Sequence, residues 1–376
     1  MKTKKFTRLC VGPMSKNCID ATIEISNEKN IEMILIASRR QIEAEEFGCG
    51  YVENYSTEKF SEYIRGQKSS NISLARDHGG PWQGNFEIQK NLNVEQSMLI
   101  AKKSFVVDID SGFRYIHIDP SIPINSENLT ATEIQNRLFE LYGFLNEYAL
   151  LKDIKLTFEL GTEEQNGYGQ DLEKFENFLN AVSLFCKKNR FQMPGFVVAQ
   201  TGTKVMETKN IGFFGNDEFQ NDQFSLEKIY ETISICRKYG VKLKEHNTDY
   251  LSDSALALRP YLGIDSSNVA PEFGVVETRA LLYVLRMNKF NAELNEFIEI
   301  ANNSGKWKKW LIKGKKYSDI EKAIISGHYV FSNDRIHKIK EEVARQLNIK
   351  GFDLDHYLKT QIKSSIMRYL QLFNRV

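Results

Sequence analysis

Acidic and histidine side chains follow several short apolar runs of this chain, at the point where each run ends. The run 72–78 ends in Asp77 and His78, and the run 241–247 contains His246. An imidazole can hold a divalent ion, while a neighbouring carboxylate moves a proton on the substrate that the ion polarises. The pair Asp77–His78 therefore indicates metal-assisted proton transfer, although most histidines in proteins are not metal ligands.

A second pair, His117 and Asp119, lies in the run 114–121 and alternates with apolar residues. In a strand, both side chains would therefore point to the same face. If that face is the inner end of a barrel, the pair belongs to a site, and if not, it is a structural hydrogen bond. Both interpretations stay open, and we count His117 and Asp119 as candidate substrate-binding residues.

A mixed shell of nitrogen and oxygen ligands can be assembled from the ends of these runs. Glu159 lies inside an apolar run, where an unpaired carboxylate is costly to bury, so a metal or a cation should accompany it. Nitrogen and oxygen ligands suit Zn²⁺, with Mn²⁺ or another divalent ion as the alternative. The predicted metal ligands are His78, Glu159, Gln200 and His246.

The apolar runs themselves read as strands covered on both faces, because they are rich in Val, Ile, Leu and Phe and alternate little. Segments with caps and helical spacing of apolar residues lie between them. We expect strands near 8–14, 32–38, 72–78, 114–121, 155–162, 195–202, 241–247 and 262–270, and helices at 56–64, 130–150, 171–188 and 225–239.

Eight alternations of strand and helix over about 280 residues favour a (β/α)8 TIM barrel, an α/β fold that carries its active site at the carboxyl ends of the strands. An open doubly wound sheet is the alternative, but no GxGxxG motif follows the first strand. We expect residues 1–287 to form the barrel. Residues 288–376 should form a helical extension packed on the barrel or on a partner subunit, with the Lys-rich stretch 306–316 as a solvated face.

Composition excludes several classes of partner. The 376 residues carry a formal net charge of +1, which gives no reason to expect nucleic acid or an anionic membrane. No stretch approaches the roughly 20 apolar residues of a spanning helix, and the amino-terminal segment lacks a signal-peptide core. Five dispersed cysteines without CxxC spacing fit reduced thiols in the cytoplasm. We therefore expect a cytoplasmic protein with a small-molecule partner.

Several motifs resemble the family of the so-called non-catalytic subunit of class II tagatose-bisphosphate aldolase. The resemblance runs across nearly the whole chain and implies a TIM barrel related to the metal-dependent ketose-bisphosphate aldolases. It rests on RDHGGP at 76–81, IHIDPS at 116–121, ELGTE at 159–163, VAQTG at 198–202, EHNTDY at 245–250 and DRI at 334–336.

The resemblance also implies roles for individual residues. His78, Glu159 and His246 match positions at or near the metal, and Asp77 matches the catalytic acid. Glu163 and Asp249, within the same motifs, are further catalytic candidates. A metal histidine of the aldolases should fall near position 201, where this chain has none, so Gln200 is the proposed replacement.

Other departures from the family pattern lie after strands one, two and eight, where a substrate would sit. An Arg there can pair bidentately with a phosphate or carboxylate, although a surface arginine pair is the alternative. Lys204, after strand six, could also meet an anion. The candidate substrate-binding residues at these strand ends are Lys16, Asn17, Arg39, Arg40, Lys204, Asn268 and Glu272.

Three functions fit these features. The first is a metal-dependent aldolase on a phosphorylated ketose, in which the ion stabilises an enediolate and Asp77 shuttles the proton. The second is a ketose or keturonate epimerase that uses the same site. The third is a non-catalytic stabilising subunit of a separate aldolase chain, which would not need an intact metal shell. The chain could also form homo-oligomers.

Overall fold

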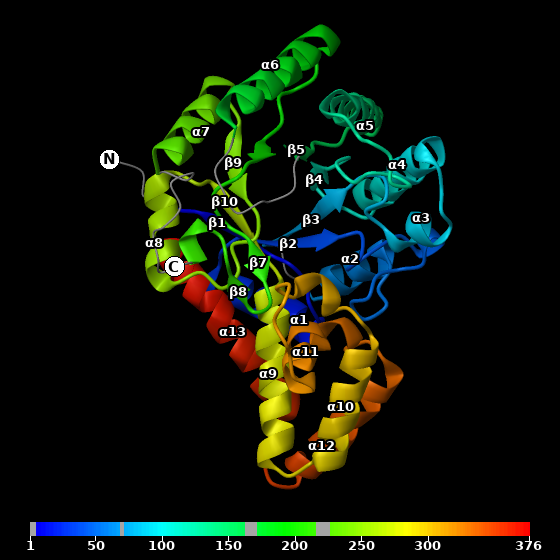
Figure 1. Ribbon diagram of the computed structural model, residues 1–376, viewed down its shortest axis with the longest axis vertical. Coiled ribbons are helices and arrows are strands. Elements are labelled where there is room, and N and C mark those ends of the chain that lie inside the picture. The colour runs from blue at the N-terminus through cyan, green and yellow to red at the C-terminus, as the bar shows by residue number, and fades with distance from the viewer. Residues whose placement is uncertain (1–4, 68–70, 162–170, 216–225) are drawn as a thin grey trace.

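A closed barrel of eight parallel strands forms the centre of the molecule in the computed structural model, which describes residues 5–67, 71–161, 171–215 and 226–376 (Figure 1). The strands close in the order β1-β10-β9-β6-β5-β4-β3-β2. The expected (β/α)8 barrel is therefore confirmed. Its strands are β1 (Arg8–Val11), β2 (Met33–Ser38), β3 (Ile72–Gly79), β4 (Tyr115–Ile118), β5 (Thr157–Leu160), β6 (Phe196–Val198), β9 (Lys242–Glu245) and β10 (Ser266–Val269).

Helices surround the strands and explain why the apolar runs alternate so little. In β2 five consecutive residues, 33–37, are buried, because one face meets the barrel interior and the other meets the helix layer. Caps predicted from the sequence are present at Ser56, Thr130 and Asp171. The surrounding helices are α1 (Lys16–Lys29), α2 (Thr57–Gly66), α3 (Asn85–Gln89), α4 (Val94–Asp110), α5 (Ala131–Leu151), α6 (Leu172–Asn189), α7 (Leu226–Lys238), α8 (Asp253–Leu262) and α9 (Pro271–Met287).

The carboxyl-terminal part is helical and lies at one side of the barrel, at the lower end of Figure 1. One hydrophobic cluster joins the second half of α9 to the helices that follow it, with Phe297, Ile339 and Leu358 at its centre. The last helix then returns to the barrel and packs along α1 and α9. These helices are α10 (Asn291–Asn303), α11 (Asp319–Ser326), α12 (Asp334–Asn348) and α13 (Leu354–Leu372).

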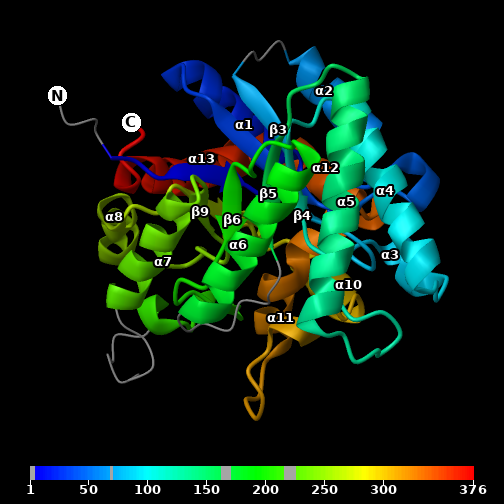
Figure 2. The same ribbon diagram turned by 90° about the horizontal axis from the view of Figure 1, so that it is seen from above.

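The second half of α13 belongs to the core of the barrel itself. Ile362, Ile366 and Tyr369 are fully buried in the same cluster as the residues of β1 and β2. The backbone nitrogen of Thr7, just before β1, also donates to the carbonyl of Phe373. The helical extension thus packs on the barrel of its own chain, while the exact boundary at residue 287 stays a prediction. Figure 2 shows α13 beside α1 from above.

A two-stranded sheet that the sequence analysis does not anticipate connects the barrel to the helical part. It consists of β7 (Val205–Met206) and β8 (Lys209–Asn210), which follow β6 and pair in antiparallel fashion. The backbone nitrogen of Glu207, in its turn, donates to the carbonyl of Trp310 at 2.7 Å. The segment around Trp310 is therefore held against the loop that leaves the carboxyl end of β6.

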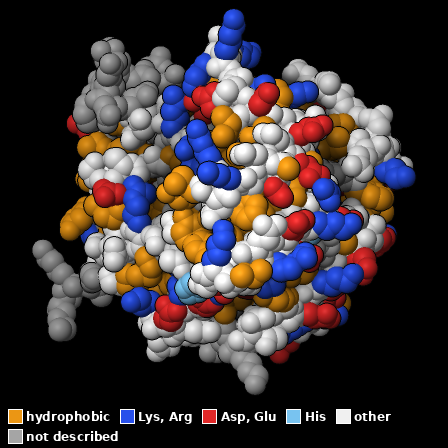
Figure 3. Space-filling view, turned by 90° about the horizontal axis from the view of Figure 1, so that it is seen from below, with side chains coloured by type: hydrophobic (Ala, Val, Ile, Leu, Met, Phe, Trp, Pro, Cys, Tyr) orange, Lys and Arg blue, Asp and Glu red, His pale blue; other side chains and the backbone are white. Residues whose placement is uncertain are grey.

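The surface at the end of α9, α10 and α12 carries charges of both signs. In Figure 3 lysines and arginines are interspersed there with acidic and hydrophobic side chains, in keeping with the net charge of +1. Within the four described ranges, no helix combines the length and the apolar character needed to cross a membrane.

Candidate metal centre

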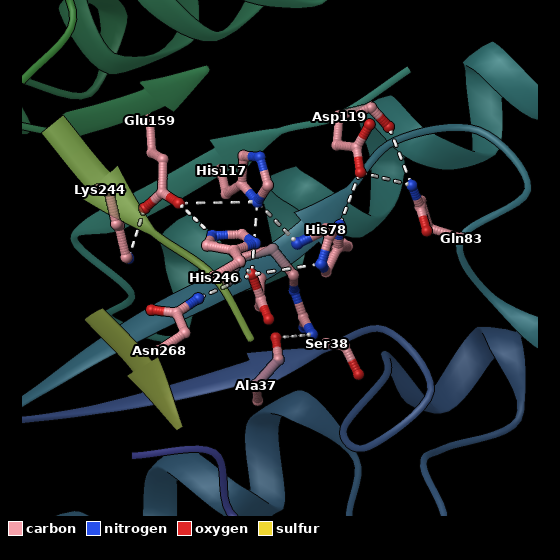
Figure 4. Close-up of polar contacts among 12 residues, drawn as sticks. Ala37, Ser38, His78, Gln83, His117, Asp119, Glu159, Lys244, His246 and Asn268 are labelled. Carbon is pink, nitrogen blue, oxygen red and sulfur yellow. Dashed lines mark hydrogen bonds and ion pairs between the residues drawn. The ribbon is translucent and has the colours of Figure 1, made fainter. Parts of the chain in front are cut away.

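Three histidines converge at the carboxyl end of the barrel strands. His78 is the last residue but one of β3, His117 lies in β4 and His246 follows β9. Their ring centroids lie 5.1 Å apart in each of the three pairs, and the rings point toward one another in Figure 4. With Asp77, they offer ligand atoms that all lie within 4.8 Å of one another. The sequence alone predicts one metal shell that contains His78 and His246, and a contact of His117 with the substrate.

An irregularity in β3 explains how two consecutive residues reach the same centre. Neighbouring side chains of a regular strand point to opposite faces. Arg76 pairs with Ile116 and Gly79 with Ile118, so β3 has one residue more than β4 over this interval. Such a bulge re-aims side chains. His78 also adopts a left-handed φ of 43°, a conformation uncommon outside glycine. The bulge thereby turns both Asp77 and His78 toward the barrel mouth.

Asp77 lies among the imidazole nitrogens. Its Oδ1 is 3.3 Å from Nδ1 of His117 and 3.9 Å from Nε2 of both His78 and His246. The ligand atoms of a tetrahedral zinc site with bonds of about 2.0–2.1 Å lie roughly 3.3–3.4 Å apart. The side chains present therefore fit a divalent ion after small adjustments. Three imidazoles alone form a donor set that Zn²⁺ accepts with an open position, and this leaves Asp77 beside the ion.

The ring of His117 is enclosed on its far side. A Cβ atom on Gly161 would come 2.4 Å from its Nε2, closer than real contacts allow. That buried nitrogen has no hydrogen-bond partner among the described residues. Its Nδ1 accepts from the backbone nitrogen of His78 at 3.1 Å, and this bond would be exchanged for the ion when a metal binds. Gly161 therefore makes room for the imidazole at the position that the centre requires.

Asp119 holds the outer nitrogen of His78. Its Oδ2 lies 2.6 Å from Nδ1 of His78 and accepts from Nε2 of Gln83 at 3.0 Å. Metal-binding histidines commonly have a carboxylate on the ring nitrogen that does not face the metal, which fixes the ring and its tautomer. Asp119 therefore contacts a candidate ligand directly, and its expected contact with substrate stays a prediction.

Glu159 of β5 lies beside His117 of the neighbouring strand β4. Its Oε1 is 2.9 Å from Nε2 of His246 and 3.8 Å from Nδ1 of His117. Its Oε2 accepts from Nζ of Lys244 at 2.5 Å. The cation that the sequence analysis expected beside this buried carboxylate is thus Lys244, and one oxygen of Glu159 still faces the imidazoles.

The electrostatic field at the mouth favours a cation. Burial lowers the pKa of His78, but the charges of Asp77 and Asp119 outweigh this effect and raise the pKa to about 9. Although burial alone would raise them, contacts with cationic groups lower the pKa of Asp119 and of Glu159 to about 2 each. Of the three carboxylates at the mouth, Asp77, Asp119 and Glu159, Lys244 balances the charge of Glu159. A divalent ion would balance the charge of the other two.

A hollow lies over this centre, in two parts of about 240 and 410 Å³, which is the size expected for a small-molecule site. Both parts are bordered by Arg40, His78 and His246. Six other sequence candidates line one part or the other: Asp77, Asp249, Asn268, His117, Asp119 and Lys204. Burial raises the pKa of Asp249 to about 7, and the charge of Glu272 adds to this shift.

The remaining candidates lie elsewhere. Lys16 and Asn17 border a separate cleft beside α12, where Lys16 pairs with Asp20. Arg39 is buried and bonded to Glu43, Glu87 and the carbonyl of Gly80, because it points away from the mouth.

Two more candidates are buried. Glu272 accepts from the hydroxyl of Tyr369 and the backbone of Tyr250. Gln200 is buried after β6, and its role as a ligand stays a prediction. Glu163 lies outside the described residues.

Two residues of the mouth come from a segment that the sequence analysis assigned to a solvated face. Lys309 and Trp310, in a short 3-10 turn of the helical part, line the hollow with Tyr329. No local pattern reveals this, because the contact depends on how the extension docks. The role of His117 as a possible ligand could have been predicted, because its strand lies between two strands that carry predicted ligands.

Comparison with known proteins shows a shared fold. No family model and no curated sequence matches the chain. Among solved structures, a probable tagatose 6 phosphate kinase from Sinorhizobium meliloti 1021 has a TM-score of 0.79 at 14% identity, covering 97% of this chain and 100% of that chain.

Two enzymes follow at lower similarity. A fructuronate-tagaturonate epimerase from Cohnella laeviribosi has a TM-score of 0.58 at 12% identity, covering 99% of this chain and 82% of that chain. A fructose-bisphosphate aldolase from Campylobacter jejuni has a TM-score of 0.54 at 11% identity, covering 99% of this chain and 91% of that chain. At these identities the likeness shows a common barrel fold, shared with an aldolase and a sugar epimerase, and the subunit family indicated by the motifs stays a prediction.

Proposed function

We propose that this chain is a metal-dependent enzyme that cleaves or forms a carbon–carbon bond in a phosphorylated ketose. The observation that carries the proposal is the convergence of His78, His117 and His246 around the carboxylate of Asp77 at a barrel mouth. Zn²⁺ is the proposed ion, with Mn²⁺ as the alternative. The substrate class is supported by fold neighbours that include an aldolase and a sugar epimerase.

Asp77 is the proposed proton carrier. A divalent ion at the three imidazoles would supply Lewis-acid polarisation of a substrate carbonyl. Asp77 is ionised at neutral pH, since the charges of the nearby histidines outweigh burial and lower its pKa. Asn268 donates to its Oδ1 at 3.3 Å and fixes its position. In cleavage, Asp77 takes the proton from the hydroxyl on the carbon whose bond breaks, and in condensation it returns that proton.

Other residues position this machinery. Asp119 and Gln83 fix the ring of His78. Glu159 is fixed by its bond with Lys244. Burial lowers the pKa of Lys244, but the surrounding groups, Glu159 among them, raise it above its usual value, so the amine stays protonated. A protonated amine is no nucleophile, so Lys244 does not suit a mechanism through a covalent imine.

A sugar epimerase is the second candidate, and Asp249 favours it. An epimerase that removes and returns a proton on opposite faces needs a second acid or base across the substrate. Asp249 lines the same hollow as Asp77, and its pKa of about 7 lets it exchange a proton near neutral pH. Its Oδ1 accepts from the backbone nitrogens of Ala270 and Glu272, which fixes its position.

The products separate these functions. The purified chain, loaded with Zn²⁺ or Mn²⁺, would be incubated with ketose 1-phosphates, ketose bisphosphates and keturonates, and the products followed by NMR. We expect two fragments from a phosphorylated ketose, with turnover by Asp77→Asn reduced about 10²- to 10⁴-fold. A single isomer would instead establish the epimerase. No turnover of any sugar by the metal-loaded chain would overturn both and favour a non-catalytic subunit that binds an aldolase chain.

A further inference from the structure

The helical part of the chain contributes a wall to the barrel mouth. Glu207, in the turn between β7 and β8, holds the segment 307–317 by three contacts. Its backbone nitrogen donates to the carbonyl of Trp310, and its carboxylate pairs with Lys315 at 3.0 Å and accepts from the hydroxyl of Tyr317. Trp310 also donates through Nε1 to the hydroxyl of Tyr329 at 3.2 Å. These contacts fix Lys309 at the edge of the hollow.

Two cations, Arg40 and Lys309, border the smaller part of the hollow without an acidic partner. Within the described residues, no ion pair or side-chain hydrogen bond joins Arg40 or Lys309 to a carboxylate. Nζ of Lys309 instead lies 4.6 Å from the ring centre of Trp310 and 5.6 Å from that of Tyr329. The nearby lysines Lys315 and Lys322 differ, since each pairs with an acidic residue.

Arg40 and Lys309 border the same part of the hollow, so their positive charges act on each other. The Lys309 side chain as a whole is exposed, but desolvation of its ammonium group, followed by the positive charge of Arg40, lowers its pKa to about 8. Two like charges held without a counterion raise the energy of the empty site. An anion between them removes that repulsion and gains charge-assisted hydrogen bonds. The same hollow is bordered by Asp77, His78 and His246, so one ligand can reach both groups.

We propose that Arg40 and Lys309 bind the anionic end group of the sugar substrate, a phosphate monoester or a carboxylate, while its carbonyl end lies at the histidines. The proposal deepens the proposed function and rests on it for the sugar. It assigns to the helical part a specificity-determining residue, Lys309, that the barrel alone would lack. Trp310 and Tyr329 would restrict the position of the anion through their contacts with Lys309.

Anion binding can be tested separately from the metal. The chain would be treated with a chelator and titrated calorimetrically with inorganic phosphate at low salt, comparing wild type with Lys309→Gln and Arg40→Gln. Lys308→Gln is the matched control, because Lys308 is exposed, lies over Trp307 and does not border the hollow. We expect the affinity for phosphate to be at least tenfold weaker in the first two variants. In the control it should equal that of wild type. Equal affinity in all four proteins would overturn the proposal.

The source of the anion is resolved by a second titration with fructose 6-phosphate, glucuronate and fructose. We expect fructose to bind weakly and equally in every variant. Dependence on Lys309 for the sugar phosphate alone assigns a phosphate, and for glucuronate alone it assigns a carboxylate. If all three sugars bind alike, the cation pair is not an anion site. Lys309→Glu, at an exposed position that should fold normally, repeats the test with reversed charge. Metal binding and turnover are separate readouts, so their failure would leave this result intact.

Discussion

Two adjacent residue pairs, Arg39–Arg40 and Arg76–Asp77, are each divided between two polar clusters of the barrel. Arg39 and Arg76 point into a buried network, where Arg39 pairs with Glu43 and Glu87, and Arg76 pairs with Asp108. Their neighbours Arg40 and Asp77 point into the mouth. The two clusters therefore begin from the same strand ends and differ in how their charges are balanced.

In the buried network each guanidinium is matched by carboxylates of the same chain. Arg76 makes two bonds to Asp108, at 2.5 and 2.8 Å, and further bonds to the carbonyls of Ala37 and Ile42. At the mouth, Asp77 and Asp119 face histidines, and Arg40 faces a hollow. Charges balanced internally indicate a structural role. Charges that face a hollow without such balance indicate a ligand.

The largest expected effect is the loss of turnover in Asp77→Asn. Removing a positioned proton carrier costs about 10²- to 10⁴-fold in rate. The amide is nearly isosteric and leaves three imidazoles in place, so we expect bound metal and stability close to wild type. Turnover, metal content and urea unfolding of the same preparation check this. A variant that retains full turnover would remove Asp77 from the mechanism.

The opposite result is expected for Arg76→Met in the buried network. Removing one partner of a buried ion pair leaves Asp108 uncompensated, which costs about 3–5 kcal/mol of stability. The metal site of the molecules that remain folded should be intact. Urea unfolding and metal content distinguish the two effects. Unchanged stability, or a selective loss of metal, would erase the distinction between the clusters.

A smaller effect is expected when the supports of the histidines are changed. Asp119→Asn weakens the contact with Nδ1 of His78, and partners of this kind typically contribute about 10- to 100-fold to metal affinity. Competition with a chromogenic chelator measures that affinity. Gln83→Ala, which removes only the contact beyond Asp119, should have a weaker effect. Equal affinities in wild type and Asp119→Asn would show that the ring needs no such support.

Gly161→Ala tests the position of His117, on the other side of the centre. Its new methyl group would meet Nε2 of His117 at 2.4 Å and displace the ring. We expect weaker metal binding, measured by the same competition. Gly66→Ala is the control, because a Cβ there meets nothing within 4 Å. Metal affinity equal to that of the control would mean that His117 is not a ligand.

The smallest effect is expected at the surface. Lys102 pairs with Glu140 at 2.6 Å, but both side chains are partly exposed to water. Lys102→Ala should change stability by about 0–1 kcal/mol and leave metal binding unchanged. Urea unfolding of Lys102→Ala and Arg76→Met in parallel compares the two losses of stability. A loss as large as that of the buried pair would mean that burial does not separate them.

The sequence was sufficient to predict the barrel and part of its mouth. All eight strands lie within or close to their expected ranges, because a strand covered on both faces leaves a continuous apolar run. Asp77, His78 and His246 were found from their positions at strand ends. The bulge that aims Asp77 and His78 together was not predictable, since it depends on pairing with β4 rather than on local residue types.

Features that depend on distant contacts could not be predicted from the sequence. The alternation in β4 showed that His117 and Asp119 share a face, but it could not show which face. The pairing of Arg39 with Glu87 depends on a helix 48 residues away. The docking of Lys309 at the mouth depends on the β7–β8 turn, which carries no strong signal in the sequence.

The central claim, a metal centre of three histidines, is tested most directly by elemental analysis of the chain after loading with Zn²⁺ and dialysis. Wild type would be compared with His78→Ala, His117→Ala and His246→Ala, and with His356→Ala as the control, since His356 is exposed on α13. We predict about one zinc per chain in wild type and control, as in catalytic sites with three protein ligands, and a loss in all three variants. Zinc retained at the wild-type level by His117→Ala, or no zinc in wild type, would contradict the account.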